Sequence, residues 1–361
     1  MPNQKESSPE SSSEDECRPE AVADTSDTGE AIEWGCPPGV PEFVPARGLA
    51  NSHLQTLYGT LLPARPAIAA TLQRKLRFAD GDFAVLHDNR PEEWNRGDHV
   101  VLLMHGLSGC HQSGYMVRVA ARLLARGARV FRMDHRGCGA GRMLAQHPYH
   151  AGRIEDLEAA IRLIERLCPE TPISIAGFSL SGNLLLRYLG DQPNSLPLSL
   201  FRAVAVCPPI DLKHCVTRLG ESRMGQRYDW HFARQLVSDV TGTPQWRDDV
   251  PLAHMRRPPR RLIDFDESYT APASGFESAD HYYEFASAAN HLSKVQVHTT
   301  VLISEDDPLV CAEPWRRLDL LPPNITVCAT RHGGHLGFIG RKGVDPDNRW
   351  MDWRVVDWLL N

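Results

Sequence analysis

Residues 173–183 read ISIAGFSLSGN, a short apolar run followed by a serine, a leucine and further small residues. The apolar run predicts a buried β-strand, and the leucine-rich stretch after it predicts a helix. Ser179 would then lie at the apex of a strand–turn–helix, where a nucleophile elbow has the pattern G-x-S-x-G. Gly177 fits this pattern, whereas Ser181 stands at the second glycine position, with Gly182 one residue later. Taken alone, the stretch fits a nucleophile and a helix-capping serine about equally well.

Short apolar runs alternate with helical patterns after residue 70. The runs VVLLM (100–104), ARVFRM (128–133) and ISIAGF (173–178) are nearly continuous in their apolar character. Such runs are typical of parallel strands that helices cover on both faces. We therefore predict an α/β fold with a mostly parallel, eight-stranded sheet. The expected strands are Leu72–Phe78, Phe83–Asp88, His99–His105, Ala128–Asp134, Pro172–Phe178, Arg202–Cys207, His298–Ser304 and Ile325–Thr330.

The helical patterns lie between these strands. In Ile154–Cys168, apolar residues recur at intervals of three and four, which places one apolar stripe on a helix that should pack on the sheet. The other expected helices cover Met116–Arg126, Leu184–Leu189 and Pro314–Leu321.

The chain divides into a tail and a folded part. Residues 1–30 hold nine acidic residues against two basic ones, a net charge of −7 (2 − 9), and little that could be buried. We expect residues 1–35 to form a disordered acidic tail and residues 36–361 to form one α/β domain. Residues from about 209 to 290 interrupt the strand–helix alternation, and we interpret them as an inserted, mostly helical cap over the sheet.

Charge and hydropathy exclude some functions. The whole chain carries a net charge of −6, which leaves +1 (−6 minus −7) outside the acidic stretch, too little to attract nucleic acid. The strongest apolar run, VVLLM, is far shorter than the roughly 20 residues that span a bilayer, so no stable membrane insertion is expected. The N-terminus lacks the order of a secretory signal, and we expect a cytoplasmic protein.

The cysteines and histidines show no ligand pattern. Nine cysteines without a C-x-x-C spacing predict reduced thiols in place of a disulfide framework. No pair of histidines or cysteines at ligand spacing stands beside a second pair, so we predict no metal site. No cofactor is expected either.

A serine nucleophile needs an acid, and the stretch VLISEDDPLV (301–310) offers two. It follows the first strand predicted after the cap, and open α/β sheets place their sites at such strand ends. We favour Asp307, which directly precedes the Pro-apolar-Val continuation, and keep Asp306 as the alternative. The other role of either carboxylate would be to cap a helix or to bond the turn.

The base should follow the last strand, where HGGHLGF (332–338) forms a glycine-rich loop. His335 comes after paired glycines and is favoured over His332. The chain order Ser179, Asp307, His335 is the order that a nucleophile elbow on an α/β sheet requires. This ordered set is more specific than any of its members.

Backbone donors for an oxyanion hole are expected at two places. The stretch HGLSG (105–109) follows the strand VVLLM, and a glycine-rich turn there leaves N–H groups free to point into a site. One donor would be Leu107, and the other would be Leu180, the residue after the nucleophile. The alternative for HGLSG is a plain tight turn.

At this point the chain resembles the α/β-hydrolase superfamily, and more narrowly its YheT-like branch, also called hydrolase family four. The resemblance extends from about Pro45 to the C-terminus. Its motifs are ARGLANSHLQTLYG (46–59), HGLSG (105–109), YHAGRIEDL (149–157), GFSLSGN (177–183), YYEFASAANHL (282–292), EDDPLV (305–310) and HGGHLGFIG (332–340). Together these motifs are specific, because HLQT and GGHLGF are not general features of the superfamily.

The resemblance implies a serine hydrolase with a Ser-Asp-His triad that acts on carboxylic esters. Relatives are esterases or transfer acyl groups to alcohols, and Ser179, Asp307 and His335 fall on the matching positions. Relatives usually carry glycine where this chain has Ser181. We therefore predict a serine carboxylesterase that cleaves small-molecule or lipid-like esters through an acyl-enzyme. The rival hypothesis is a catalytically weak or inactive binding or scaffold protein that has kept the fold.

Overall fold

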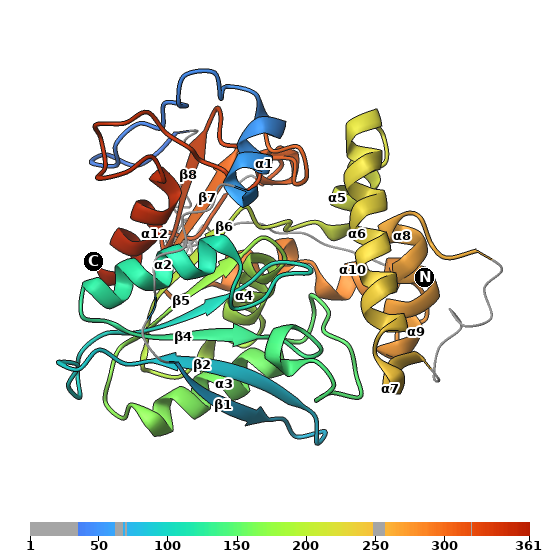
Figure 1. Ribbon diagram of the computed structural model, residues 1–361, viewed down its shortest axis with the longest axis horizontal. Helices are drawn as coiled ribbons and strands as arrows, with labels where there is room; N and C mark the ends of the chain where they lie inside the picture. Colours follow the sequence, from blue (N-terminus) through green and yellow to red (C-terminus); the bar gives the residue numbers. More distant parts are fainter. Residues whose placement is uncertain (1–34, 62–67, 69–70, 248–256, 319) are drawn as a thin grey trace, which may run out of the picture.

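The computed structural model describes residues 35–61, 68, 71–247, 257–318 and 320–361. One eight-stranded sheet with the order β1-β2-β4-β3-β5-β6-β7-β8 forms its centre (Figure 1). The first three neighbours, β1, β2 and β4, pair antiparallel, and all the other pairs are parallel. The strands are β1 (Leu72–Arg77), β2 (Phe83–Asn89), β3 (Val100–Met104), β4 (Arg129–Asp134), β5 (Ile173–Phe178), β6 (Leu200–Val206), β7 (Thr299–Ser304) and β8 (Ile325–Thr330). The predicted α/β class is confirmed, with strand ends shifted by two residues at most.

Helices cover both faces of the sheet, as the continuous apolar strands require. One buried cluster joins α3 (Ile154–Leu167) and α4 (Leu180–Asp191) to the first face, and another joins α2 (Gly114–Ala125) and α12 (Trp350–Leu360) to the second. The strands β3, β4 and β5 are buried along their whole length. The strands β3 and β5 end at the loops that carry Leu107 and Ser179, while the loops of Asp307 and His335 follow β7 and β8.

One expected helix is much shorter than predicted. The helix expected over Pro314–Leu321 is a single turn, α11 (Glu313–Arg316). Leu318 and Leu321 still pack against the core, but they reach it without continuing the helix. The apolar spacing there reflects burial, which a segment beyond a helix end can also achieve.

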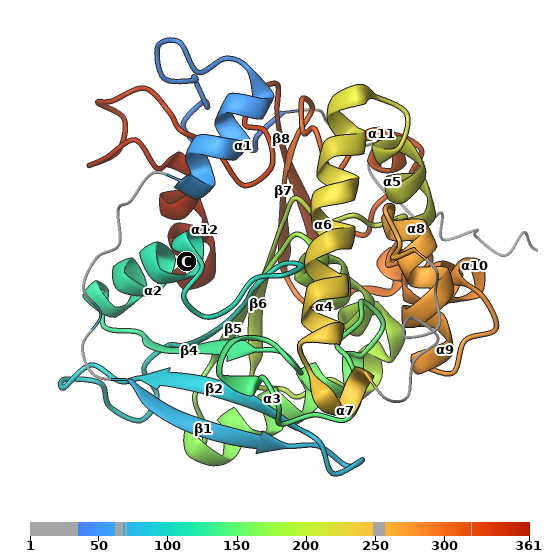
Figure 2. The ribbon, with the colours of Figure 1, turned by 45° about the vertical axis from the view of Figure 1, so that its right-hand side comes forward.

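A run of helices connects β6 to β7. It consists of α5 (Leu212–Leu219), α6 (Arg223–Thr241), α7 (Pro244–Arg247), α8 (Leu262–Phe265), the π-helical turn η4 (Asp266–Thr270), α9 (Ala271–Ala273), α10 (Ala279–Ala286) and η5 (Ala289–Lys294). The helices α5 to α10 gather beyond the carboxyl ends of the parallel strands (Figures 1 and 2). Leu107 and Leu180, the residues expected to carry the oxyanion donors, pack against the buried cluster that these helices share.

Two further features concern the chain ends and the cysteines. The acidic tail expected at residues 1–35 lies outside the described residues except for Gly35. Cys36 and Cys328 form a disulfide that joins the N-terminal segment to β8, so the expectation of reduced thiols is wrong at this pair. The two cysteines are 292 residues apart, and only the packing of the N-terminal segment on β8 brings them together. Among the described residues, no helix has the length and apolar character needed to cross a membrane.

Candidate active site

Ser179 lies at a sharp turn between β5 and α4. It has a positive φ of 53°, which is rare for a residue other than glycine and is typical of strained functional turns. Its side chain makes no capping hydrogen bond to α4, so the helix-cap alternative does not describe the role of this hydroxyl. The turn needs glycine on both sides of it: a Cβ on Gly177 would lie 2.3 Å from the Ser181 carbonyl oxygen, and a Cβ on Gly106 would lie 2.9 Å from the Ser179 Cβ.

The structure brings Ser179, His335 and Asp307 into one hydrogen-bonded relay. His335 Nδ1 lies 2.7 Å from Asp307 Oδ2, and His335 Nε2 lies 2.9 Å from Ser179 Oγ. An ionised carboxylate only accepts hydrogen bonds, so Nδ1 donates to Asp307 and Nε2 accepts the Ser179 proton. The Asp307 Oδ1 atom accepts from the backbone N–H groups of Leu309 and Val310, which fixes the carboxylate plane.

Asp306 and His332, the alternatives considered for the acid and the base, contact each other and not the relay. His332 Nδ1 lies 3.2 Å from Asp306 Oδ2, and Asp306 Oδ1 accepts from the backbone N–H of Gly334 at 2.9 Å. His332 is exposed, whereas the His335 side chain is 9% exposed. Asp306 therefore braces the loop that carries His335.

Helix α1 (Ser52–Leu61) holds the other side of that loop. The His335 backbone N–H donates to Thr56 Oγ1 at 2.9 Å. The Gln55 side chain accepts from the Ile339 N–H at 2.7 Å and donates to the Ile339 carbonyl at 3.2 Å. A Cβ on Gly337 would lie 2.5 Å from the Gln55 carbonyl oxygen, so this close approach requires glycine.

The sequence did not reveal the role of Gln55 and Thr56, the α1 residues that make these supporting contacts. HLQT (53–56) and HGGHLGFIG (332–340) were two separate motifs of the resemblance. In the sequence, the first motif reads as the polar start of a helix and the second as a run of glycines. Nothing in either pattern indicates that the helix packs on the glycine-rich loop.

The backbone N–H groups of Leu107 and Leu180 are available beside Ser179. Neither donates a hydrogen bond within the part of the chain that the structure describes. Both residues line the same pocket as Ser179 and His335. Ser108, which follows Leu107, has a φ of +56°, and the Gly106 N–H donates to the Tyr115 hydroxyl at 3.0 Å, so the HGLSG loop is shaped by specific contacts.

Ser181 joins the nucleophile turn to the HGLSG loop. Its hydroxyl is fully buried and donates to the His105 carbonyl oxygen at 2.5 Å. The Ser181 Oγ atom also accepts from His135 Nε2 at 2.9 Å, and the Tyr149 hydroxyl lies 3.4 Å from it. Burial, followed by the neighbouring His105, holds the pKa of His135 well below its usual range, so this imidazole is neutral.

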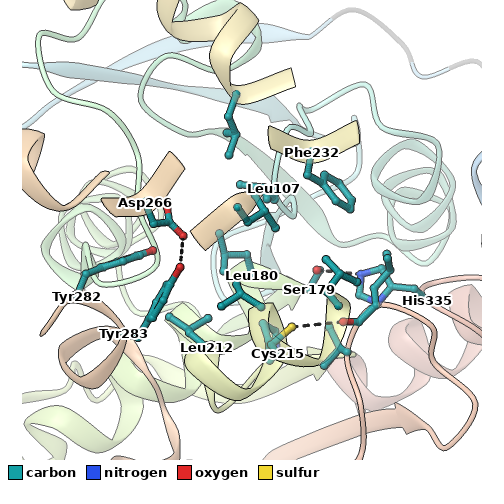
Figure 3. A pocket seen from close by; sticks show the side chains of 17 residues that line it. Leu107, Ser179, Leu180, Leu212, Cys215, Phe232, Asp266, Tyr282, Tyr283 and His335 are labelled. Atoms are coloured by element: carbon teal, nitrogen blue, oxygen red, sulfur yellow. Dashed lines mark hydrogen bonds between the residues drawn. The ribbon is translucent and has the colours of Figure 1, made fainter. Parts of the chain in front are cut away.

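The relay opens onto an elongated pocket with an empty space of about 700 Å³ (Figure 3). Ser179 and His335 lie at one end, and Asp266, Tyr282 and Tyr283 lie at the other (Figure 3). Most of the walls are apolar side chains from the HGLSG loop, from α4, from the helices between β6 and β7 and from the segment between β7 and α11. They include Leu107, Leu180, Leu212, Val216, Leu219, Phe232, Leu236, Leu262, Leu309 and Val310.

Some described side chains could offer metal-ligating atoms. One such group outside the relay is His87, His111 and Asp134. His87 Nε2 and His111 Nδ1 both contact Asp134 Oδ2, at 2.9 Å and 2.7 Å, and the two imidazole rings stack. These atoms therefore satisfy one another by hydrogen bonds.

Comparison with known proteins identifies the family. The model of the Hydrolase_4 family, described as serine aminopeptidase S33, matches residues 95–320. YheT of Escherichia coli (strain K12), a protein named as an esterase, is 31% identical over 320 residues, which cover 88% of this chain and 93% of that protein. The chain belongs to the Hydrolase_4 family.

A yeast relative and a solved structure are also similar to this chain. Medium-chain fatty acid ethyl ester synthase/esterase 2 of Saccharomyces cerevisiae is 29% identical over 309 residues, which cover 76% of this chain and 65% of the yeast protein. The solved structure of the Pyrococcus furiosus esterase Pf2001 matches with a TM-score of 0.51 at 19% identity, over 80% of this chain and 92% of that one. This Hydrolase_4 member therefore has the α/β-hydrolase fold that its motifs predicted, and it belongs among hydrolases.

Proposed function

We propose that this protein is a serine carboxylesterase in which Ser179 is the nucleophile, His335 the general base and Asp307 the residue that orients the base. The observation that carries the proposal is the continuous relay from the Asp307 carboxylate through His335 to the Ser179 hydroxyl, with hydrogen bonds of 2.7 Å and 2.9 Å. Its end opens into an apolar pocket that suits an acyl chain.

In the first half-reaction, Ser179 Oγ attacks the carbonyl carbon of the ester while its proton moves to His335 Nε2. The Leu107 and Leu180 N–H groups stabilise the oxyanion of the tetrahedral intermediate. The carbonyl re-forms, the bond to the alkoxide breaks, and His335 Nε2 returns the proton to the departing alcohol. An acyl-enzyme on Ser179 remains.

In the second half-reaction, His335 Nε2 takes a proton from water while the water oxygen attacks the acyl carbon to form a second tetrahedral intermediate. As this collapses, the bond to Ser179 Oγ breaks, His335 returns the proton to Ser179, and the carboxylic acid is released. An alcohol that replaces this water would give a new ester by the same steps. Asp307 stays ionised throughout and stabilises the imidazolium that forms twice.

The test is covalent labelling with a fluorophosphonate, which reacts with an activated serine. We expect labelling of the wild-type protein and loss of labelling in Ser179→Ala, together with a loss of p-nitrophenyl ester hydrolysis on the order of 10⁴-fold or more. Asp306→Asn is the control, because it changes the neighbouring carboxylate, which contacts neither Ser179 nor the His335 side chain. A folded wild-type protein that is neither labelled nor active on esters would support the scaffold hypothesis instead.

A further inference from the structure

The end of the pocket that lies away from Ser179 carries polar groups that the proposed chemistry does not use. Asp266 is the first residue of the π-helical turn η4, and it lines the pocket of Ser179 and a second, adjoining pocket. Its Oδ2 accepts from the Tyr283 hydroxyl at 2.7 Å, and its Oδ1 accepts from Thr270 Oγ1 at 2.6 Å. Each carboxylate oxygen keeps a lone pair for a further donor.

Tyr282 brings a donor to the same place. The residue is 4% exposed, and its ring lies 5.3 Å from that of Tyr283, centroid to centroid. The Tyr282 oxygen accepts from the Ala151 N–H at 3.1 Å, but its own proton has no acceptor among the described residues. Figure 3 shows the hydroxyls of both tyrosines and the Asp266 carboxylate at one end of the pocket.

We propose that this end binds a hydroxyl group of the substrate, which an apolar spacer separates from the ester carbonyl. A hydroxyl is the group that can donate to the Asp266 carboxylate and also accept the unused Tyr282 proton. The inference rests on the proposed esterase function, because it uses Ser179 to fix the position of the carbonyl.

Other chemical groups fit this end less well. A methyl end would exclude water from the carboxylate and give it no donor beyond Tyr283 and Thr270, which is costly for a charged group. An ammonium would satisfy Asp266 but would leave the Tyr282 proton unpaired. A carboxylate would be repelled by Asp266. Burial raises the pKa of Asp266 to about 6, so the group is an acceptor above that pH.

The apolar spacer follows from what lies between the two ends. Leu107, Leu180 and Leu212 stand between Ser179 and the Asp266–Tyr283 pair (Figure 3). A hydroxyl directly beside the ester bond, as in a glycerol ester, would fall among these leucines. The preferred substrate therefore carries its hydroxyl remote from the ester, as an ω-hydroxyacyl or ω-hydroxyalkyl chain does.

The experiment compares matched ester pairs on the full-length protein. One series pairs p-nitrophenyl esters of ω-hydroxy acids with the unsubstituted acids over short, medium and long chains. A second series carries the hydroxyl on the alcohol half of an acetate ester. We expect kcat/KM for one chain length to favour the hydroxylated ester by about tenfold or more, the worth of a hydrogen bond to a charged group. The series that shows the preference assigns the pocket to the acyl or the alcohol half.

Two variants test the residues. Asp266→Asn should reduce the preference, and the double variant Asp266→Leu/Tyr283→Phe, which removes the carboxylate together with the Tyr283 hydroxyl that donates to it, should reverse it. Asp264→Asn, an exposed carboxylate two residues away, is the matched control and should keep the wild-type preference. Each rate is divided by the rate of the same variant on the acetate ester, so that a general loss of fold or of turnover cancels.

The outcomes separate this inference from the proposed function. If the wild-type protein hydrolyses esters and reacts with the fluorophosphonate but shows no preference at any chain length, the hydroxyl site is wrong and the esterase stands. An unchanged preference in both Asp266 variants would also overturn it. Absence of labelling and of all ester hydrolysis would instead refute the esterase.

Discussion

Removal of the Ser181 hydroxyl tests how the nucleophile turn and the HGLSG loop are joined. The change Ser181→Ala deletes one oxygen atom that donates to the His105 carbonyl at 2.5 Å and accepts from His135 Nε2 at 2.9 Å. His105 immediately precedes Gly106 and Leu107. The variant therefore leaves a buried carbonyl unpaired at the start of the loop that holds the proposed oxyanion donor.

The magnitude follows from these two bonds. An unpaired buried carbonyl costs about 1 to 3 kcal/mol, and the lost bond to His135 adds about 1 kcal/mol, so we expect unfolding to become easier by about 2 to 4 kcal/mol. The upper limit on catalysis is the full loss of one oxyanion donor, about 3 kcal/mol. Because the loop is also held by the Tyr115 hydroxyl on the Gly106 N–H, we expect a smaller loss, about tenfold in kcat.

A matched control exists in β5, the strand that precedes the nucleophile turn. Ser174 is also fully buried and donates from its hydroxyl to a backbone carbonyl, that of Leu359, at 2.8 Å. It lies near the start of β5, whereas Ser181 lies beyond its end. Ser174→Ala should therefore lose comparable stability without a fall in kcat.

The assay combines urea unfolding, steady-state hydrolysis of a p-nitrophenyl ester and the affinity of an alkylboronic acid, which mimics the tetrahedral intermediate. For Ser181→Ala, kcat and boronate affinity should fall together while KM changes little, because the oxyanion is bound mainly in the transition state. The reasoning is refuted if both serine variants lose stability alike and neither changes kcat or boronate affinity.

Three further changes should give distinct results. In assays of ester hydrolysis, Asp307→Asn should lower kcat/KM by at least about 10³-fold, because the amide no longer fixes the tautomer of His335. Asp306→Asn should lower kcat/KM by about tenfold at most. Thr56→Val removes the acceptor of the His335 backbone N–H and should lower kcat by about tenfold, with a rate of fluorophosphonate labelling that falls in parallel. Burial raises the pKa of Asp266 to about 6, above its unfolded value of about 4, so the folded state holds this proton more tightly and wild-type stability falls as the pH rises from 4 to 6. In thermal unfolding across pH, Asp266→Asn should therefore be more stable than wild type by about 2 to 3 kcal/mol at pH 8 and should lose this advantage near pH 4.

Much of the fold could be predicted because burial determines the strand sequences directly. The runs at β3, β4 and β5 are apolar on both faces, and each of these strands is buried along its whole length. The helix α3 was equally readable, since Leu157, Ile161 and Ile164 form its buried stripe. The helix expected at Pro314–Leu321 failed for the opposite reason, because leucines beyond the end of α11 reach the core without helical spacing.

What the sequence could not provide are contacts between distant segments. The disulfide of Cys36 with Cys328 spans 292 residues, and the hydrogen bond from the His335 N–H to Thr56 of α1 joins positions 279 residues apart. Neither leaves a local pattern. Asp266 lies in a segment without clean helical periodicity, so only the packed helices reveal that its carboxylate faces the pocket.

The departure from G-x-S-x-G at Ser181 shows where the pattern and the physics differ. A Cβ on Gly177 would lie 2.3 Å from the Ser181 carbonyl oxygen, so the strand side of the turn admits only glycine. At position 181 the chain accommodates a hydroxymethyl group, and that group makes hydrogen bonds to the neighbouring loop. A rule written for two glycines treats the positions as equivalent, although here the first avoids a clash and the second is free to carry a side chain. The serine thus adds a direct link between the proposed nucleophile and the proposed oxyanion hole that a glycine at this position could not supply.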